Sequence, residues 1–516
     1  MIPRSARTAA SRIDDRDEDS VRVQPVTPLP KLQLSVILLM QAAEQIGGSV
    51  IYPFVNQFVR ETGITGGDEA KTGYYAGIIG SVLFIAECVS VLFWCRASDR
   101  VGRRPVMLLA MLGLCLSILG TGLSTHYVPL LLCQATLGLF NGSVGASKNI
   151  MAEMSDSTNI AAALAFVPFT VATGVSLGSF VGGALAMPSK RWPGTFGKLA
   201  FFVSHPYFLP CAVAGLYSAT CLFLGAVFLK ETLPVLVKQK KRIPQASAGA
   251  HPWSNLLKFR RDNVAYSTVP AATRAQDSVP ELEIGETTSS DTDGPAPASP
   301  PLKDVLIPRV VLSFVLQIFI GFTYQSWLVL LPLMYSTSIP LGGLGLEPSQ
   351  IGTVLSVSGF AAGMFQLAFF GWSVRRFGPR TVLCAGLACF FIGFSVFPVA
   401  SAYAQPAGRV DGKVVFLVGV QICAFLVSKM SWGSNLIFVI SSAPTPESLA
   451  TVNGLAQLLH SMARGIAPAV TASLFSLSIK YQLAGGLLVY WFLLTFILCG
   501  ILVGSRLPKG LQGAEK

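Results

Sequence analysis

Residues 84–104 read FIAECVSVLFWCRASDRVGRR, and residues 360–380 read FAAGMFQLAFFGWSVRRFGPR. Both stretches are apolar runs that end in a short basic loop. Six residues recur between them at a constant separation: Phe84 and Phe360, Ala86 and Ala362, Phe93 and Phe369, Arg100 and Arg376, Gly102 and Gly378, and Arg104 and Arg380. This internal repeat predicts a chain built from two related units.

The composition of the whole chain indicates a membrane protein. Of its 516 residues, 52% are hydrophobic and 12% are charged, and the mean hydropathy is +0.59. Soluble chains carry about 25% charged residues, so a large soluble enzyme is not expected. A transmembrane β-barrel is not expected either, because the apolar runs are continuous rather than alternating. We expect an all-α polytopic membrane protein.

The apolar runs divide into two sets of six, which predicts twelve transmembrane helices in two six-helix halves. The expected organisation is a cytoplasmic disordered tail (1–33), an N-terminal half (34–229), a cytoplasmic disordered linker (230–307), a C-terminal half (308–505) and a cytoplasmic tail (506–516). The predicted spans are 34–58, 74–95, 105–124, 128–150, 160–186 and 207–229, then 308–334, 349–374, 380–402, 413–442, 450–478 and 483–505.

The distribution of Lys and Arg predicts the topology. With both termini in the cytoplasm, 28 of these residues fall on the cytoplasmic side and eight on the other side. Basic loops are retained in the cytoplasm, which favours an N-in, C-in protein. We expect the plasma membrane rather than the vacuole. Because the net charge of +12 lies mostly in tails and alternate loops, it does not indicate nucleic-acid binding.

Several kinds of site are not expected. All ten cysteines lie in or at the ends of apolar runs, which is typical of packing residues. The four histidines are far apart in sequence, so no metal site is predicted. No phosphate-binding Gly-rich motif indicates ATP drive. We therefore expect no cofactor, and we expect that the protein is not an enzyme.

The basic loop after the second span combines an acid, a glycine and arginines. A positive-inside anchor explains the arginines but not Asp99 or Gly102. The loop resembles that of the major facilitator superfamily, Gly-x-x-x-Asp-Arg-x-Gly-Arg-Arg, although Cys95 replaces the first Gly. The resemblance implies that Asp99 caps a helix of the other half and that basic residues pair with Glu153, closing a cytoplasmic gate. The matching residues are Asp99, Arg100, Gly102, Arg103 and Arg104.

The fifth span carries glycines at short intervals, Gly174, Gly178, Gly182 and Gly183. Such residues let helices approach closely, so dense packing is one interpretation. They also resemble the fifth-helix motif of proton-coupled antiporters in the same superfamily, with Ser179 in place of Pro. That resemblance favours export over uptake. In the fourth span, however, Gln134 replaces the Arg of the family pattern, which leaves the mode of proton coupling open.

Ionisable residues inside spans are functional hypotheses because burying a charge in a bilayer is costly. In the first span Gln41, Glu44 and Tyr52 lie on one helical face, which predicts a cavity-facing stripe. Glu44 is the first candidate proton carrier, and Glu87 in the second span is another. The alternative for Glu44 is a protonated, purely structural side chain.

The eleventh span has a polar stripe formed by Asn453, Gln457, His460 and Arg464. Such a face is expected to contact protein or water rather than lipid. Arg464, with Gly465 and Pro468, also resembles the eleventh helix of fungal and plant zinc-induced facilitator-like transporters. Arg464 is a candidate for an anionic substrate group. His460 is a candidate for proton coupling, or a neutral histidine satisfied within the bundle.

The second half adds candidate cavity residues in its seventh and tenth spans. Polar groups beside aromatic rings suit an amphipathic organic ligand, although Trp432 fits a core position equally well. These residues are Gln317, Tyr324, Lys429, Trp432 and Asn435.

Taken with the resemblance, the sequence predicts a secondary active transporter that works by rocking of two six-helix halves. We expect proton-coupled export of a small organic molecule: a drug, a secondary metabolite or an organic acid. The expected partners are this substrate, protons and the lipid bilayer, and the chain is expected to be monomeric. The alternatives are an importer of the same fold and a membrane sensor that does not transport.

Overall fold

The computed structural model describes residues 30–141, 160–233, 306–444 and 448–508, together with Ser147, Ile150, Met151, Glu153 and Met154. Nearly all of the two predicted tails and of the predicted linker lies outside these residues.

Within the described ranges the chain is helical and contains no strand, so the predicted all-α class is confirmed. The first group of helices comprises α1 (Lys31–Ser49), α2 (Val55–Glu61), α3 (Thr72–Val101), α4 (Arg103–Leu123), α5 (Tyr127–Asn141), α7 (Ile160–Leu185), α8 (Pro188–Arg191), α9 (Ala200–Ser204) and α10 (Phe208–Phe228). The second group comprises α13 (Pro308–Ser336), α14 (Pro348–Phe377), α15 (Pro379–Ala407), α16 (Gly412–Ser428), α17 (Met430–Ser441), α18 (Leu449–Tyr481) and α19 (Leu488–Gly504). Short 3₁₀ turns are η1 (Glu69–Lys71), η2 (Phe196–Lys198) and η3 (Ile339–Leu341).

The helices have the length and composition of membrane spans. In the described part of the chain, nine helical segments are long and apolar enough to cross a bilayer, and α5 and α19 are shorter apolar helices. A multi-pass helical membrane protein follows from these lengths. The exact number of twelve spans stays a prediction. The predicted first span divides into α1 and α2, and Pro53, which lacks a backbone N–H, lies between them.

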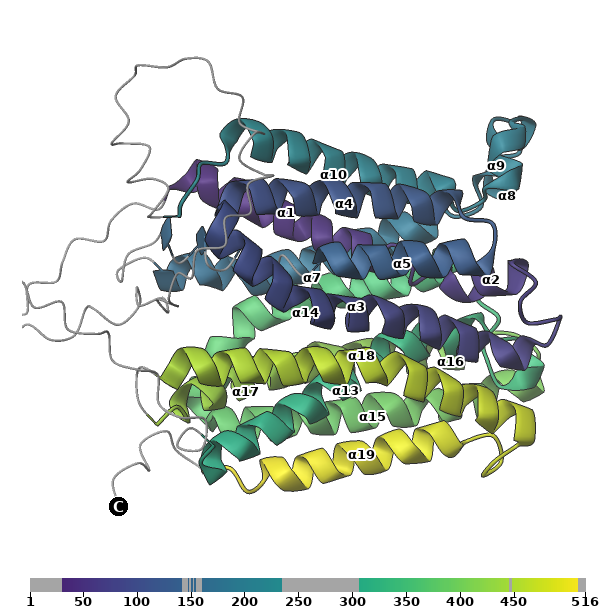
Figure 1. The fold of residues 1–516 in the computed structure, drawn as a ribbon. Helices are drawn as coiled ribbons and strands as arrows, with labels where there is room; N and C mark the ends of the chain where they lie inside the picture. The colour runs from purple at the N-terminus through teal and green to yellow at the C-terminus, as the bar shows by residue number, and fades with distance from the viewer. Residues whose placement is uncertain are drawn as a thin grey trace, which may run out of the picture.

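The helices run side by side along one direction (Figure 1). The purple-to-teal helices α1–α10 and the green-to-yellow helices α13–α19 form two groups, and α7 packs on α14 and α3 on α18 where the groups meet. We call the end at which α1 begins and α19 ends the terminal end. The opposite end, which carries α2, α8 and α9, is the loop end.

The buried apolar side chains follow the same division. One large cluster contains residues between 34 and 229, and another contains residues between 316 and 507. In the second cluster, Trp327 packs against the rings of Phe390, Phe394, Phe397 and Phe425. Each group of helices therefore has its own core, which suits two bodies that move against each other.

The repeated glycines have the same backbone role in both groups. Gly102 links α3 to α4 with φ of 119°, and Gly378 links α14 to α15 with φ of 81°. Residues that carry a Cβ atom rarely adopt such positive backbone φ angles, so glycine is favoured at both turns. The structure thereby explains why this pair is identical in the repeat.

The two groups approach closely toward the loop end. A Cβ atom at Gly77 of α3 would lie 2.7 Å from the carbonyl oxygen of Pro468 in α18. One at Gly352 of α14 would lie 2.7 Å from the carbonyl oxygen of Ser179 in α7. On α3 the tightest contacts with α18 are at Gly73, Gly77 and Gly80, and Ile85, which approaches Gly465, is already exposed, as are Val89 and Phe93 further on. The helix pair α3 and α18 is thus packed more closely toward the loop end than toward the basic loop.

Candidate functional site

A buried arginine organises the basic loop at the terminal end. The Arg103 side chain is 2% exposed and forms ion pairs with Asp99, one turn earlier, and with Glu153 at 2.9 Å. Its guanidinium also donates to the hydroxyl of Ser98 at 2.9 Å. The Arg103–Glu153 pair is the one that the resemblance implied. Because both acids and the hydroxyl surround one guanidinium, its charge is compensated despite burial.

Residues at the end of α10 and directly after it complete this hydrogen-bond network. Glu231 accepts hydrogen bonds from the backbone N–H groups of Arg103 at 2.8 Å and Arg104 at 3.1 Å, so it caps the N-terminus of α4. The hydroxyl of Thr232 donates to the second carboxylate oxygen of Glu153 at 2.7 Å. Arg104 donates to the carbonyl of Ala226 near the end of α10. These contacts join α3, α4 and the segment after α10.

Among the described residues Asp99 has a partner in its own group of helices. Its carboxylate pairs with Arg103 in its own group of helices, and its side chain is 55% exposed. Arg100 is also exposed. On the turns of α3 that precede Asp99, Val89 and Phe93 are exposed as well. Among the described residues the hydrogen bonds and ion pairs of this loop lie within the first group of helices, and the implied capping of a helix of the other half by Asp99 stays a prediction.

We expect loss of the Glu231 carboxylate to weaken the start of α4. Glu231→Ala removes the acceptor of two N–H groups, and loss of a helix cap costs about 1 kcal/mol. The midpoint of thermal unfolding in detergent should fall accordingly. Lys230→Ala, at the exposed neighbouring position, is the matched control and should leave the midpoint unchanged. Equal midpoints for the two variants would show that Glu231 does not support α4.

A second set of polar residues lies between the two groups of helices. The guanidinium of Arg464 in α18 lies over the ring of Phe84 in α3, 4.2 Å from its centroid. Tyr52, which follows α1, lies within electrostatic range of Arg464, Tyr324 and Glu87. Glu87 in turn accepts a hydrogen bond from the side-chain amide of Asn141 at 3.0 Å. Side chains from α3, α13 and α18 therefore lie in the neighbourhood of Tyr52.

The second group of helices adds a cation and an amide pair. The ammonium of Lys429 lies 3.8 Å from the centroid of Tyr324, a cation–π geometry. The Asn435 amide donates to the side chain of Gln317 at 2.6 Å, and Trp432 is half-buried beside the core. Among the described residues no ion pair is formed by Lys429 or Arg464. Each of these cations lies on an aromatic ring and, in the described part of the chain, not on a carboxylate, so its charge is available to bind an acidic group of a ligand.

The residues of the predicted polar stripe of α18 contact different helices. His460 is buried against Gly321 of α13, where a Cβ atom would lie 2.7 Å from its Nδ1. Arg464, one turn later, faces α3. Gln457 is exposed and Asn453 is half-buried. The structure thus separates His460, which lies within its own group of helices, from Arg464, which lies between the groups.

Gln41 and Glu44, two of the first-span candidates, are buried, and Gln134 lies inside the first group of helices. Gln41 and Glu44 are each 2% exposed on α1. The Gln134 amide donates to the hydroxyl of Thr121 in α4 at 3.2 Å. Gln134 therefore links α5 to α4 and is separate from the set around Tyr52.

The fifth-span glycines contact two different helices. Cβ atoms at Gly174, Gly178 and Gly182 would collide with α1 or the turn after it, whereas one at Gly183 would lie 2.5 Å from the carbonyl of Pro348 in α14. Three of the four glycines therefore permit packing within the first group of helices. Gly183 permits the approach of the second group.

Polar contacts cross between the groups at the loop end. Arg60 of α2 and Glu69 of η1 form an ion pair at 2.8 Å. Arg60 also donates to the carbonyl of Ser336 at the end of α13 at 3.1 Å, and Glu69 accepts from the N–H of Ser338 at 2.9 Å. We call Arg60, Glu69, Ser336 and Ser338 the loop-end clasp. It joins the two groups at the end opposite the basic loop.

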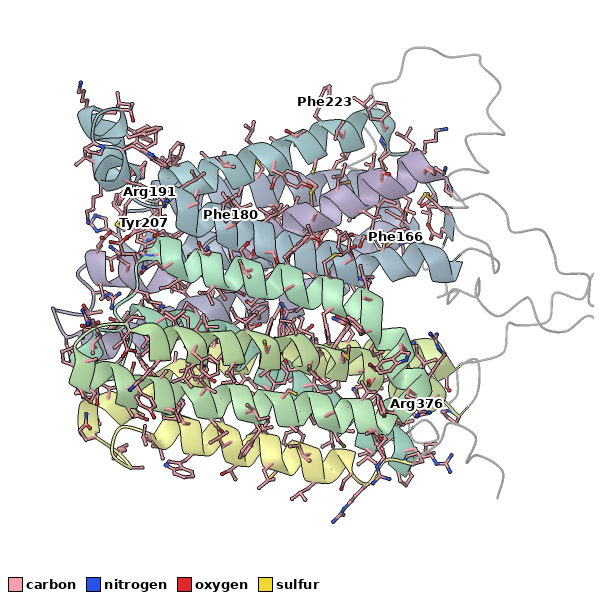
Figure 2. The ribbon with its side chains drawn as sticks, turned by 180° about the vertical axis from the view of Figure 1, so that it is seen from behind. Phe166, Phe180, Arg191, Tyr207, Phe223 and Arg376 are labelled. Atoms are coloured by element: carbon pink, nitrogen blue, oxygen red, sulfur yellow. The ribbon has the colours of Figure 1, made fainter. Side chains whose placement is uncertain are left out.

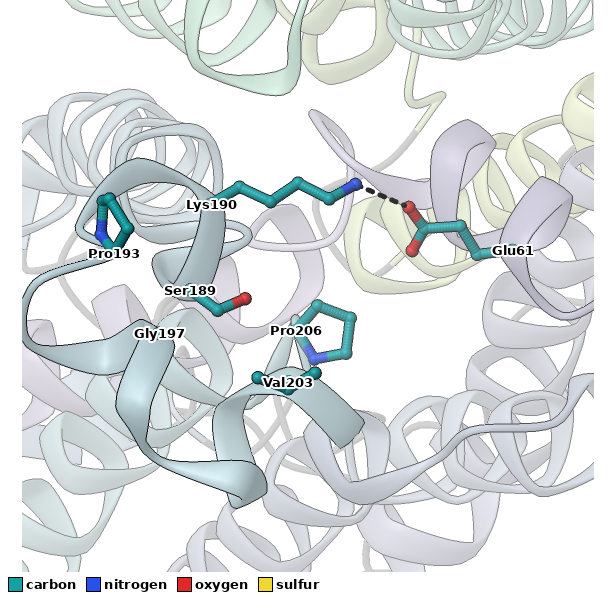
Figure 3. Close-up of a pocket in the computed structure, with 7 residues that line it drawn as sticks. All are labelled: Glu61, Ser189, Lys190, Pro193, Gly197, Val203 and Pro206. Atoms are coloured by element: carbon teal, nitrogen blue, oxygen red, sulfur yellow. Dashed lines mark ion pairs between the residues drawn. The ribbon is translucent and has the colours of Figure 1, made fainter.

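A separate pocket of about 520 Å³ opens at the loop end (Figure 3). Glu61 lies on one side, and Lys190 reaches it at 3.9 Å from the other. Glu61 also accepts from the hydroxyl of Tyr207, which precedes α10, at 2.6 Å. Burial and the adjacent Glu61 carboxylate raise the pKa of Tyr207, so this hydroxyl stays protonated and donates.

The described residues hold no group of three or more His, Cys, Asp or Glu placed to bind a metal ion. Ten cysteines occur as free thiols in the described ranges. Sequence reasoning missed Glu231, Thr232 and Asn141 as partners of the predicted residues, because each contact joins segments distant in sequence.

Comparison with known proteins gives the family context. The model of the Major Facilitator Superfamily matches residues 37–468. The chain is 30% identical to the major facilitator-type transporter psiT2 of Psilocybe cyanescens, over 99% of this chain and 96% of that protein. It is 25% identical to the efflux pump azaK of Aspergillus niger, over 94% and 90% of the two chains.

Two further similarities concern the subgroup and the fold. The chain is 23% identical to the Arabidopsis thaliana protein zinc induced facilitator-like 1, over 92% of this chain and 91% of the relative. Among solved structures, a D-xylose-proton symporter superimposes with a TM-score of 0.64 at 14% identity, covering 95% of this chain and all of the symporter. These similarities confirm the predicted family resemblance and the predicted fold.

Proposed function

The chain belongs to the major facilitator superfamily of secondary transporters, and we propose that it exports a small organic molecule in exchange for protons. The proposal rests on one observation above the others: acidic, basic and aromatic side chains from both groups of helices meet around Tyr52. Charged groups at membrane depth are costly and are retained where they serve an ion or a substrate.

The proposed mechanism is alternating access by rocking of the two groups of helices. The loop-end clasp and the close approach of α3 to α18 hold the groups together at the loop end. The ion pairs of Arg103 in the basic loop lie within the first group of helices, and in the proposed mechanism α3 separates from α18 there. With N-in topology, this arrangement is the state that opens to the cytoplasm, from which substrate is loaded.

Export is favoured over import by two observations. The first is the fifth-helix glycine pattern, whose Gly183 permits the approach of α14. The second is the similarity to a relative named as an efflux pump. The substrate class that we propose is an amphipathic organic molecule, a drug, secondary metabolite or organic acid, because Lys429 and Arg464 each lie on an aromatic ring. We propose a monomer in the plasma membrane.

The decisive experiment is a flux assay with purified protein in proteoliposomes. A pH gradient across the vesicles is imposed, and a panel of amphipathic drugs, metabolites and organic acids is tested for uphill movement. Movement opposite to the proton gradient supports antiport. Movement with the gradient would indicate an importer, and no movement of any compound by well-inserted protein would favour a sensor.

The loop-end clasp gives a prediction for the conformational equilibrium. Arg60→Ala combined with Glu69→Ala removes the hydrogen bonds to Ser336 and Ser338, so the state open at the loop end should become about fivefold more populated, a shift of about 1 kcal/mol. Ser81→Cys reports this change, because Ser81 is buried where its hydroxyl accepts the N–H of Ala469. Labelling of that cysteine by a membrane-impermeant maleimide should become faster.

The matched control for the clasp is Lys71→Gln. Lys71 pairs with Asp68 in the same loop, at 3.9 Å, and both side chains are exposed. Its neutralisation should leave the labelling rate at Ser81→Cys unchanged. If the control and the double variant label at the same rate, the clasp does not hold the loop end closed.

A further inference from the structure

The connection between α7 and α10 forms a small protruding hairpin. It consists of α8, η2 and α9, and we call residues 187–206 the side hairpin. A hydrogen bond from the N–H of Met187 to the carbonyl of Pro206, at 2.9 Å, closes its base. Figure 1 shows α8 and α9 standing out from the side of the bundle beyond α10, at the loop end. The hairpin therefore extends sideways, across the direction of the long helices.

The surface of the side hairpin is unusually apolar for a connecting loop. Leu199 is 51% exposed and Val203 is 59% exposed, and Trp192 and Phe201 are exposed as well. Contacts between aromatic rings stabilise the interior of the hairpin; the ring centroids of Phe196 and Phe202, for example, are 4.9 Å apart. The hairpin thus has an ordered aromatic centre of its own and still presents large apolar side chains outward. Exposed apolar clusters of this kind mark contact with a partner or a membrane.

The charges of the hairpin have one sign. Residues 186–206 contain Lys190, Arg191 and Lys198 and no Asp or Glu. The Arg191 guanidinium lies 5.5 Å from the Trp192 ring centroid, and Lys198 precedes Leu199 directly. Aromatic residues beside Lys and Arg are the composition of the membrane–water interface, where basic head groups reach the lipid phosphates.

The apolar surface of the hairpin continues from that of the adjoining helices. On α7, Leu177 and Phe180 are exposed, and on α10 Leu216 and Phe223 are exposed. Phe180 and Phe223 lie on the outer helices of the first group (Figure 2). In a multi-pass membrane protein these outer faces contact lipid. The side hairpin begins two residues after α7 ends and reaches to the start of α10, so it lies at the level where that lipid contact ends.

We propose that the side hairpin is an interfacial anchor that lies on the lipid leaflet at the loop end. Trp192, Leu199 and Phe201 enter the headgroup region, and Arg191 and Lys198 face the lipid phosphates. Its partner is the lipid surface itself, because the basic charge complements phosphate and the apolar face continues the lipid-facing surface of α7 and α10. This inference does not depend on the substrate or on the direction of transport.

The test measures the depth of single positions in vesicles. A fluorescent non-natural amino acid is placed at Leu199 of the full chain, which is reconstituted in phosphatidylcholine vesicles with a minority of phosphatidylglycerol. Matched positions are Phe223, on the outer face of α10, and Ile64, an exposed apolar residue in the loop after α2. Brominated phosphatidylcholine should quench position 199 about as strongly as position 223. Quenching at position 199 should exceed that at position 64 several-fold.

A charge variant tests the phosphate contact separately. Lys198→Gln should reduce quenching at position 199 in the phosphatidylglycerol vesicles, whereas Lys413→Gln, exposed at the same end, should not. Quenching of position 199 by aqueous iodide to the same extent as position 64, with no effect of brominated lipid, would overturn the proposal. So would protection from both quenchers, which would indicate that a protein partner covers the hairpin.

Discussion

Replacing Arg103 by alanine is expected to destabilise the folded protein by about 3 to 5 kcal/mol, because removing one member of a buried ion pair leaves its partner uncompensated. Arg103 is almost fully buried, and Glu153, one of its partners, is only 14% exposed. The same substitution leaves the Ser98 hydroxyl and Asp99 without their guanidinium donor. The yield of monodisperse protein and the midpoint of thermal unfolding should both fall sharply.

Two comparisons separate this effect from a general loss of positive charge. Arg100→Ala removes an exposed arginine of the same loop and should change the midpoint little. Exchanging the charges, with Arg103→Glu and Glu153→Arg together, should recover part of the stability that Arg103→Glu alone loses. If Arg103→Ala and Arg100→Ala unfold at the same temperature, the buried pair does not stabilise the loop.

The long helices were predictable because the bilayer imposes a simple requirement. A span needs about 20 consecutive apolar residues, and each such run is visible in one sequence without knowledge of its neighbours. The predicted runs 105–124 and 160–186 correspond closely to α4 and α7. The turn at Gly102 was also predictable, since the repeat gave a second copy at Gly378.

The partners of the site residues were not predictable in the same way. The carboxylate of Glu231 caps α4 from more than 120 residues away, and nothing near Arg103 in sequence indicates that acceptor. Helical spacing placed His460 and Arg464 on one stripe, but a stripe is wide enough to touch two helices. Which helix each residue meets depends on the packing of the whole bundle.

The largest functional effect is expected at Glu87. Glu87 lies on α3, accepts a hydrogen bond from Asn141 and shares the surroundings of Tyr52 with Arg464. Glu87→Gln keeps the size of the side chain but fixes it in a neutral, protonated-like form. If this acid carries the proton, flux driven by a pH gradient should be lost, while downhill exchange of substrate across the membrane should continue. Both are measured on the same proteoliposomes with an exported compound.

Asn141→Ala and Glu44→Gln are the comparisons that locate the coupling acid. Asn141→Ala keeps the Glu87 carboxylate and removes only its amide donor, so pH-driven flux should persist with an altered pH at half-maximal rate. Glu44, buried on α1, is the acid that the sequence favours. Loss of pH dependence in Glu44→Gln but not in Glu87→Gln would place coupling on α1.

Arg464 is the basic residue expected to affect both coupling and substrate binding, because its guanidinium lies between the two groups of helices and on the face of Phe84. Arg464→Ala removes a cation that both the coupling acid and an anionic substrate group can meet, so driven flux and exchange should fall together. Arg464→Lys keeps the charge but not the planar stacking geometry, and should restore part of the exchange. Full exchange by Arg464→Ala with unimpaired insertion would remove this residue from the transport pathway and leave Lys429 as the cation to test.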